Sequence, residues 1–591
     1  MFLAQLNNAI CLSSSFLPRI LGGQFSWCCK PAIFVDCLRC FVPSKNNYHQ
    51  AAIDYLNKPL SGWGLALLCI GIAVFLSICG GQDANWDLRN YHYYNPYAWV
   101  NDRADIDIAP AQLQSFHSPY ADLPYYYMAK AGLSSWLVSA ILAIPAATAL
   151  FFLALISKRI LPCARQNIYL IAVILIAATG ASGGPLIGTT MSEWHLVALF
   201  MFAVWLILKP FEFGNELGLT EFKLWRVLLA GILGGIAVGL KLTAGTYALG
   251  LAVLILALPA QFRIRLKRLA VLGIGGVIGT VISYGPWGYE LWCRFGNPFF
   301  PYFNNVFISP WAEPSPFSDP RYAADSLWKI LATPWRIMKV TSGLVLEMPF
   351  RDWRLGLGLP AMLWLAWTTP MLNTRRIWQA LLMMFLTIYF SWLALFGYYR
   401  YANFMELIAA LAICAIFANS LKLIDSDRLR ILAIIALLVA TAGVTNWPAW
   451  GRIAHGDMAV SAKIPSLPQD SMVMMATLEP LGFIVPSLPP KVPVISVINN
   501  FMNPAWGGHA KLHVLAAQRI AQHKGPLFAL VNASQTEEKY YMGIPIAEML
   551  LALGLEVDFK ECKSIITPMM VDNVALCGVR RVPVTPIKWQ P

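Results

Sequence analysis

Acidic and imidazole side chains gather in one polar segment, residues 80–128, which lies between two long apolar runs. Ionisable groups held beside membrane spans are costly, so they usually have a function, and Tyr and Trp are typical of the lipid–water boundary. We interpret this segment as the loop that carries the chemistry; the alternative is a solvated connector with an aromatic belt. Its carboxylates and histidines are Asp83, Asp87, Asp102, Asp105, Asp107, Asp122, His92 and His117.

Asp83 and Asp87 stand four residues apart, directly after the first apolar run. If the helix of that run continued into the loop, the two carboxylates would share one helix face. A carboxylate at a membrane surface can accept the proton of a hydroxyl group as a general base. Asp87 and Asp83 are therefore the candidate catalytic residues, with two charges that simply end a span in water as the alternative.

Cations are expected at the same side of the chain. Lys241 stands in a very short turn between two apolar runs, and Arg400 stands among tyrosines at the end of another. Both residue types suit a phosphate group, which arginine binds through two parallel hydrogen bonds; the alternative is that both snorkel from helix ends. Arg321 and Arg351, in the polar segment 285–354, are further candidate substrate-binding residues.

The composition is that of a polytopic membrane protein: 58% of residues are hydrophobic, 13% are charged, and the mean hydropathy is +0.57. Apolar runs near the bilayer-crossing length of about 20 residues predict eleven spans. No Walker-type loop and no HExxH sequence occurs, so ATP-driven transport and zincin chemistry lack support. The predicted spans are Ser61–Cys79, Ala131–Ser157, Ile168–Ser182, Ser192–Leu208, Val227–Leu240, Tyr247–Leu258, Leu269–Tyr284, Leu355–Pro370, Ile377–Phe396, a tenth that ends near Ala418, and Ile431–Val444.

The distribution of Lys and Arg predicts the orientation of these spans. With the N-terminus inside, all the basic connections are cytoplasmic, as the positive-inside rule requires. The net charge of +13 then needs no nucleic-acid partner. Segments 81–128, 285–354 and 447–591 are expected outside. The basic connections are Lys158–Arg165, Arg263–Arg268, Arg375–Arg376 and Lys422–Arg430.

The two ends of the chain differ in character from the apolar middle, 61–446. Residues 1–60 lack the pattern of a signal peptide, and we expect a cytoplasmic extension, disordered or begun at a wrong start codon. Cys37 and Cys40 could form half a zinc site, but no second pair stands at a suitable spacing. After residue 447, strand and helix patterns alternate, which predicts a small α/β domain. In it, Cys562 and Cys577 either pair in an oxidising compartment or stay reduced.

The run Asp87-Leu-Arg-Asn-Tyr91-His92 resembles the Asp-x-x-x-Tyr-His pattern in the first loop of some bacterial GT-C glycosyltransferases. The turn Gly239-Leu-Lys241-Leu-Thr243, the GNPFFPYFN segment at 296–304 and the predicted topology are similar to that family as well. The chain departs from the mannosyl and aminoarabinose transferases, which have an Asp-Glu pair where this chain has Asp87-Leu88. The expected fold is therefore an all-α, GT-C-like polytopic membrane protein with a small extracytoplasmic α/β domain.

The resemblance implies a hexosyltransferase of the bacterial inner membrane that uses a polyprenyl-phosphate sugar as donor. Asp87 would accept the proton of an acceptor hydroxyl, while Lys241 and Arg400 stabilise the departing phosphate. His92 or Asp83 would orient the base or the sugar, and Trp86 and Tyr91 would stack on a sugar ring.

The partners implied are the lipid-linked donor, membrane lipids and an acceptor that is a glycan, a lipid or a protein. A divalent metal stays open, since no ligand spacing implies one. The 296–304 segment either lines an acceptor groove or packs the outer loop. Two rival functions stay open: a transporter of an envelope lipid or glycan, and a non-enzymatic scaffold for envelope assembly.

Overall fold

The computed structural model describes residues 59–161, 167–211, 222–421, 426–502, 510–532, 539–540, 544–569 and 574–585. The expectations for residues 1–60, including the half zinc site, concern a segment that lies outside the described residues except for its last two positions.

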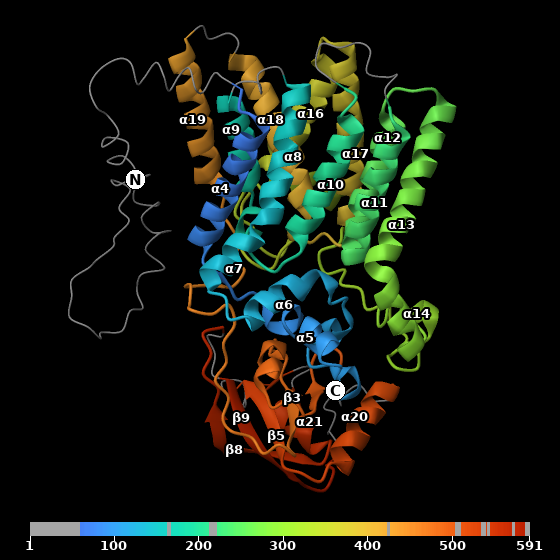
Figure 1. Ribbon diagram of the computed structural model, residues 1–591, viewed down its shortest axis with the longest axis vertical. Coiled ribbons are helices and arrows are strands. Elements are labelled where there is room, and N and C mark those ends of the chain that lie inside the picture. Colours follow the sequence, from blue (N-terminus) through green and yellow to red (C-terminus); the bar gives the residue numbers. More distant parts are fainter. Residues whose placement is uncertain are drawn as a thin grey trace, which may run out of the picture. The chain divides into compact units, whose positions relative to one another are not determined.

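Every apolar segment predicted to cross the membrane is helical in the structure (Figure 1). The second predicted span is divided at Ala143 into two consecutive helices. The helices of this part are α4 Gly62–Gly80, α7 Ser135–Leu142, α8 Ile144–Ile160, α9 Asn167–Ala178, α10 Glu193–Leu208, α11 Leu224–Leu240, α12 Gly245–Ala257, α13 Phe262–Phe295, α16 Arg354–Thr368, α17 Leu372–Leu395, α18 Asn403–Leu421 and α19 Asp427–Val444.

Within the described ranges, five helical stretches are long and apolar enough to cross a membrane, and four apolar helices are shorter. The fold is thus mostly helical with several candidate membrane spans, and the count of eleven crossings stays a prediction. The five are Gly62–Gly80, Ser135–Ile160, Phe262–Phe295, Leu372–Leu395 and Tyr399–Leu421; the shorter four are Asn167–Ala178, Glu193–Leu208, Leu224–Leu240 and Leu242–Ala257.

Helices α11 and α13 pack backbone against backbone through glycines. Gly231, Gly235 and Gly239 follow one another at four-residue spacing along α11, and a Cβ at Gly235 would lie only 2.0 Å from the carbonyl oxygen of Gly276 on α13. Small residues at this spacing let membrane helices approach closely. The packing fixes the end of α11, and with it the turn that carries Lys241.

Helix α18 lies in the interior of the helical part. In the most apolar stretch of α18, 72% of the residues are buried, against 22% in α4 and 17% in α13. Helices α4 and α13 therefore present apolar side chains outward. In the first turn of α18, Glu406 is fully buried and accepts hydrogen bonds from the backbone N–H groups of Ser182 (2.9 Å) and Gly183 (3.1 Å). This holds the glycine-rich connection between α9 and α10 against α18.

The helix of the first span does not continue into the first loop. Asp83 and Asp87 therefore do not share one helix face, which the sequence predicted only for a continuous helix. Helix α4 ends at Gly80, and Gly81 adopts a φ of 88°. Strand β1, Gln82–Asp83, then pairs antiparallel with β2, Arg452–Ile453. The pairing of β1 with β2, which lies far later in the chain, thus replaces the helical conformation at Asp83. The loop continues as short helical turns at Leu88–His92, α5 Tyr94–Val100, Arg103–Asp105, Gln112–Phe116, Tyr120–Asp122 and α6 Leu123–Lys130.

The long polar segment begins later than predicted, because α13 runs beyond Tyr284 and ends at Phe295, where Gly296 has a φ of 70°. Two short helices follow, α14 Asn304–Phe307 and α15 Leu327–Arg336.

The C-terminal part contains a five-stranded sheet in the order β4-β3-β5-β9-β8. Strands β4, β3 and β5 run parallel, whereas β9 and β8 are antiparallel to their neighbours. The predicted alternation of strands and helices is confirmed. The elements are β3 Met472–Ala476, β4 Val494–Ile498, α20 Lys511–Gln522, β5 Leu527–Asn532, α21 Ile546–Leu551, β8 Leu555–Ser564 and β9 Val574–Arg581, with a separate pair β6 Lys539–Tyr540 and β7 Ile544–Pro545.

The first loop is attached to this sheet at the edge of β4. Ile108 forms a parallel bridge with Ile495, and its N–H donates to the carbonyl oxygen of Val494 at 2.9 Å. Asp107 accepts a hydrogen bond from the Val494 N–H at 2.9 Å and a bond from Arg103 Nε at 2.9 Å. The C-terminal domain therefore helps to fix the conformation of the loop.

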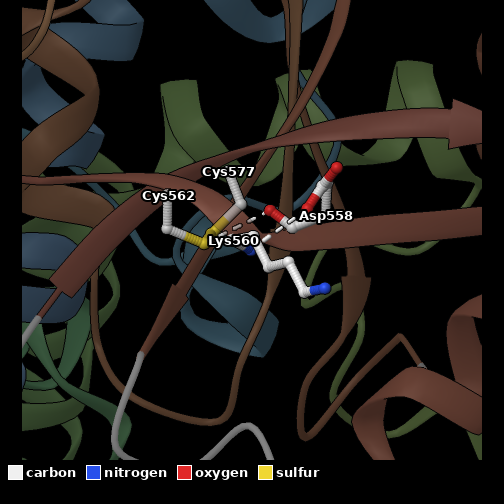
Figure 2. The surroundings of a disulfide bond; sticks show 4 residues. All are labelled: Asp558, Lys560, Cys562 and Cys577. Carbon is white, nitrogen blue, oxygen red and sulfur yellow. Dashed lines mark hydrogen bonds between the residues drawn. A yellow bond between two sulfur atoms is a disulfide. The ribbon is translucent and has the colours of Figure 1, made fainter.

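Cys562 on β8 and Cys577 on β9 form a disulfide bond between adjacent antiparallel strands (Figure 2). The sequence left open whether these two cysteines pair, and the structure joins them. Disulfides are typical of oxidising compartments outside the cytoplasm.

Candidate active site

Four charged side chains from four separate elements form a continuous chain of ion pairs. Arg400 Nη1 lies 2.9 Å from Asp87 Oδ2, and Arg400 Nε lies 3.4 Å from Glu193 Oε1. Lys241 Nζ lies 2.7 Å from the same Glu193 oxygen, and even Lys241, the most exposed of the four side chains, is only 18% exposed. We call Asp87, Arg400, Glu193 and Lys241 the charge cluster.

Each member of the charge cluster is placed by the end of a helix or by a tight turn. Glu193 is the first residue of α10, where the positive end of the helix dipole favours a carboxylate. Lys241 is extended between α11 and the turn into α12, and Arg400 lies in a short 3₁₀ turn before α18. Asp87 directly precedes the π-helical turn of the first loop. The first loop, the turn between α11 and α12, and the turn before α18 thus meet at one end of the helices.

An aromatic ring lies beside both cations of the cluster. The centroid of the Tyr401 ring is 5.1 Å from Lys241 Nζ and 5.3 Å from Arg400 Cζ. The ring of Trp450, from the start of the C-terminal part, lies 5.8 Å from the same guanidinium. Cation–π contacts of this kind hold the direction of a charged side chain without occupying its hydrogen-bond donors.

Asp87 is ionised in this setting. Burial raises the pKa of Asp87, but the positive charges of Arg400, His92 and Lys241 outweigh burial and hold that pKa below its ordinary value. The carboxylate is therefore ready to accept a proton, and its basicity depends on how closely Arg400 stays beside it.

His92 is oriented by a second carboxylate. Its Nδ1 lies 2.7 Å from Oδ1 of the buried Asp122. Burial lowers the pKa of His92, but Asp122 and then Asp87 raise it by more, so it lies above the ordinary histidine value. The second ring nitrogen, Nε2, is buried and has no hydrogen-bond partner among the described residues. Since buried polar atoms normally have a partner, this atom is available to a ligand.

The ring of His92 is part of a group of aromatic side chains that also contains Tyr91, His117 and Tyr302. The Tyr91 ring lies 4.1 Å from the His92 ring and 5.0 Å from the His117 ring. His117 Nε2 lies 2.8 Å from the Tyr302 hydroxyl, and burial lowers the pKa of His117 to about 4, so its imidazole is neutral at pH 7. Through Tyr302, the aromatic segment 296–304 reaches the site in addition to packing the outer loop.

Asp83 has a different environment from Asp87. Its Oδ1 accepts hydrogen bonds from the N–H (3.1 Å) and the side-chain amide (2.6 Å) of Asn85. Its Oδ2 accepts from the N–H and the hydroxyl of Thr190, both at 2.8 Å. These bonds tie the start of the first loop to the residues before α10. Both carboxylate oxygens of Asp83 are occupied by these bonds, so Asp87 is the better candidate base.

Three other predicted residues are not members of the charge cluster. Arg321 pairs with Asp319 at 2.7 Å, and its side chain is 64% exposed. Arg351 pairs through its backbone with Asn446 near the end of α19. Trp86 is partly buried beside Asp87 in sequence. By contrast, Lys241 and Arg400 belong to the charge cluster, and the rings of Tyr91 and His92 lie 4.1 Å apart in the loop that carries Asp87.

The sequence reasoning missed Glu193, the partner of both cations, and gave no role to Asp122, His117 and Tyr302. Glu193 could have been found, because it is an acidic residue at the very start of an apolar run, where an ionisable group needs a partner. His117 and Asp122 stood in the loop but had no spacing that linked them to Asp87. No group of three or more metal-ligating side chains with the geometry of a metal site occurs in the described ranges.

Comparisons with known proteins give a distant likeness only. No family model and no curated protein matches the sequence. Two crystal structures of ArnT from Cupriavidus metallidurans, one in the apo state and one bound to undecaprenyl phosphate, are similar in fold. Their TM-scores are 0.49 and 0.48, the identity is 12%, and the alignments cover 87% of this chain and 97% of theirs. At these values the likeness carries no argument about substrates or residue roles.

Proposed function

We propose that this protein is a membrane glycosyltransferase that moves a sugar from a polyprenyl-phosphate donor to an acceptor hydroxyl. The observation that carries the proposal is the convergence of Arg400 and Lys241 beside the ionised Asp87 at one end of the helices. A transporter would be expected to hold its charges near mid-membrane at broken helices. Here the charges come from helix ends and loops, which suits a reaction at the membrane surface.

In this proposal the donor phosphate binds between the two cations. Arg400 and Lys241 now donate to carboxylates at 2.9 Å and 2.7 Å, and a phosphate offers oxygens of the same kind. Arginine presents a fork of donors that matches two phosphate oxygens, whereas lysine acts as a point charge. The ring of Tyr401 lies beside both cations, and the bond that Arg400 Nη2 donates to the Tyr401 hydroxyl is long, at 3.4 Å, so these contacts leave most donors free for this exchange of partners.

The transfer step then runs as a single displacement. The acceptor oxygen attacks the anomeric carbon, and the bond from that carbon to the phosphate oxygen breaks with its electron pair on the phosphate. Arg400 and Lys241 stabilise the charge that develops there. Asp87 takes the hydroxyl proton, and its basicity rises as Arg400 turns toward the phosphate, because Arg400 is the charge that most lowers the pKa of Asp87.

His92 and Tyr91 orient the sugar in this scheme. The unpartnered His92 Nε2 meets a sugar or acceptor hydroxyl, while Asp122 fixes the ring from its other side. That the sugar is a hexose, and that Trp86, Arg321 and Arg351 take part in binding, stay predictions.

We further propose that the site faces the outside of the bacterial inner membrane, with the N-terminus inside and residues 447–591 outside. The charge distribution and the disulfide between Cys562 and Cys577 support this orientation. A single cysteine introduced at Pro310 in a variant without accessible native cysteines should react with a membrane-impermeant maleimide in intact cells, and one at Arg265 should not. Reaction at position 265 alone would reverse the proposed topology.

The donor proposal is tested by ligand-dependent stability. In lipid nanodiscs, undecaprenyl phosphate at about 100 times its Kd should stabilise the protein by about 2.7 kcal/mol and raise Tm accordingly. Undecaprenol, which has the same chain without the phosphate, is the control and should give a much smaller shift. Equal shifts from both lipids would mean that only the hydrocarbon is recognised, and the proposed phosphate site would be abandoned.

A further inference from the structure

A cavity of about 370 Å³ lies where the long polar segment after α13 meets the C-terminal domain. Trp311 lines it from the polar segment, and Phe501 and His513 line it from the domain. Beside the cavity, the Lys511 N–H donates to the carbonyl oxygen of Pro310 at 2.8 Å, so the two parts are in direct contact between α14 and α20 (Figure 1). The volume is within the range of about 300–1,000 Å³ that is usual for small-molecule sites.

The apolar part of the lining is aromatic. Trp311, Phe317 and Phe501 all contribute to the lining, and the rings of Phe317 and Phe501 lie 5.6 Å apart in an edge-to-face arrangement. Rings such as these offer flat apolar surfaces with a defined position. The C–H face of a pyranose ring is a partner of matching shape and polarity.

The polar part of the lining includes Glu313 and His513. Glu313 Oε1 is buried and has no hydrogen-bond partner among the described residues, and the ring nitrogens of His513 are buried beside the Phe501 backbone. Burial lowers the pKa of His513 by more than the nearby Glu313 carboxylate and the Phe501 backbone raise it. The imidazole is therefore neutral at pH 7 and offers one donor and one acceptor, and Asn500 adds a side-chain amide to the lining. Donors and acceptors beside aromatic rings suit hydroxyl groups.

We propose that this cavity binds one pyranose ring of an uncharged saccharide. The unpaired Glu313 carboxylate accepts hydrogen bonds from ring hydroxyls and disfavours an anionic sugar by charge repulsion. The identification of this saccharide with the acceptor of the transfer reaction rests on the proposed function; the binding itself does not.

One short turn runs from the cavity to Tyr91, in the loop that carries Asp87. The ring of Phe116, at the end of the turn Gln112–Phe116, lies 5.5 Å from the ring of the cavity residue Phe501. The next residue, His117, contacts Tyr91 on the other side. A glycan held in the cavity is thereby anchored next to the loop that carries Asp87, which would keep its reactive end near the donor.

The test is saccharide binding to the full-length protein in nanodiscs, measured by saturation-transfer NMR. The probes are the trisaccharides of glucose and of N-acetylglucosamine. Glu313→Gln, which keeps the side-chain size, should weaken binding about tenfold, as expected for loss of a hydrogen bond to a charged group. Trp311→Ala should abolish it. The matched controls are Glu556→Gln on β8 and Trp328→Ala on α15, two exposed positions outside the cavity.

Saturation transfer that falls in both cavity variants and persists in both controls supports the proposal. No binding of either trisaccharide at millimolar concentration, or equal binding by Trp311→Ala and wild type, overturns it. The Tm shift with undecaprenyl phosphate is measured on the same samples. A protein that responds to the lipid but binds no saccharide refutes the cavity proposal alone; one that binds saccharide but not the lipid phosphate refutes the proposed transfer function and supports the cavity.

Discussion

Asp87→Asn should reduce sugar transfer by about 10²–10⁴-fold, the usual contribution of a general base. Asparagine keeps the size of the side chain and can still face Arg400, but it does not take a proton at neutral pH. Donor binding should persist or become tighter, because Arg400 is no longer held by a carboxylate at 2.9 Å. The measurement is transfer from purified donor, with the Tm shift by undecaprenyl phosphate followed in parallel.

Two neighbouring carboxylates make this test specific. Asp105→Asn is the matched control, because Asp105 lies in the same loop and its side chain is 86% exposed. It should leave transfer unchanged. Asp83→Asn should instead lower Tm, because an amide in place of the carboxylate would set donor against donor at Asn85 or Thr190. Near wild-type transfer by Asp87→Asn, or a selective loss of turnover in a stable Asp83→Asn protein, would remove Asp87 from the role of base.

Arg400→Gln should lower transfer by about 10²–10³-fold, comparable to the loss of one donor that stabilises developing charge in a transition state. The substitution also removes the charge that most strongly lowers the pKa of Asp87, so burial then raises that pKa. Asp87 is consequently protonated at higher pH than in wild type. The acid limb of the pH–rate profile should therefore move to higher pH, a readout that a general loss of packing would not produce.

The stability cost of Arg400→Gln needs its own control, because the change leaves Asp87 buried without its ion-pair partner. The double variant Asp87→Asn, Arg400→Gln should recover part of the lost Tm while it stays inactive. Arg580→Gln is the matched substitution at an exposed arginine that pairs with Asp558 in the C-terminal sheet, and it should change neither donor binding nor transfer. If Arg400→Gln binds undecaprenyl phosphate as tightly as wild type, Arg400 is only a snorkelling residue at a helix end.

The helices and strands of this protein follow from patterns of neighbouring residues in the sequence. Apolar length predicted a helix at every proposed span, and alternating strand and helix patterns predicted the C-terminal sheet. These signals are local, because the hydrophobic demand of a bilayer and the two-residue period of a strand are written in consecutive residues. The same sequence patterns also identified Asp87, Lys241 and Arg400 as candidate functional residues.

Which charged side chains meet depends on how distant segments pack in the folded chain. Asp87 and Arg400 are 313 positions apart in sequence, and Glu193 joins them to Lys241 through helix ends that pack together only in the folded chain. Asp83 is held by the pairing of β1 with β2 and by hydrogen bonds from Thr190, and no spacing near residue 83 predicts either contact. Ion-pair partners and strand partners are set by packing between distant segments, and a periodic pattern carries no information about that packing.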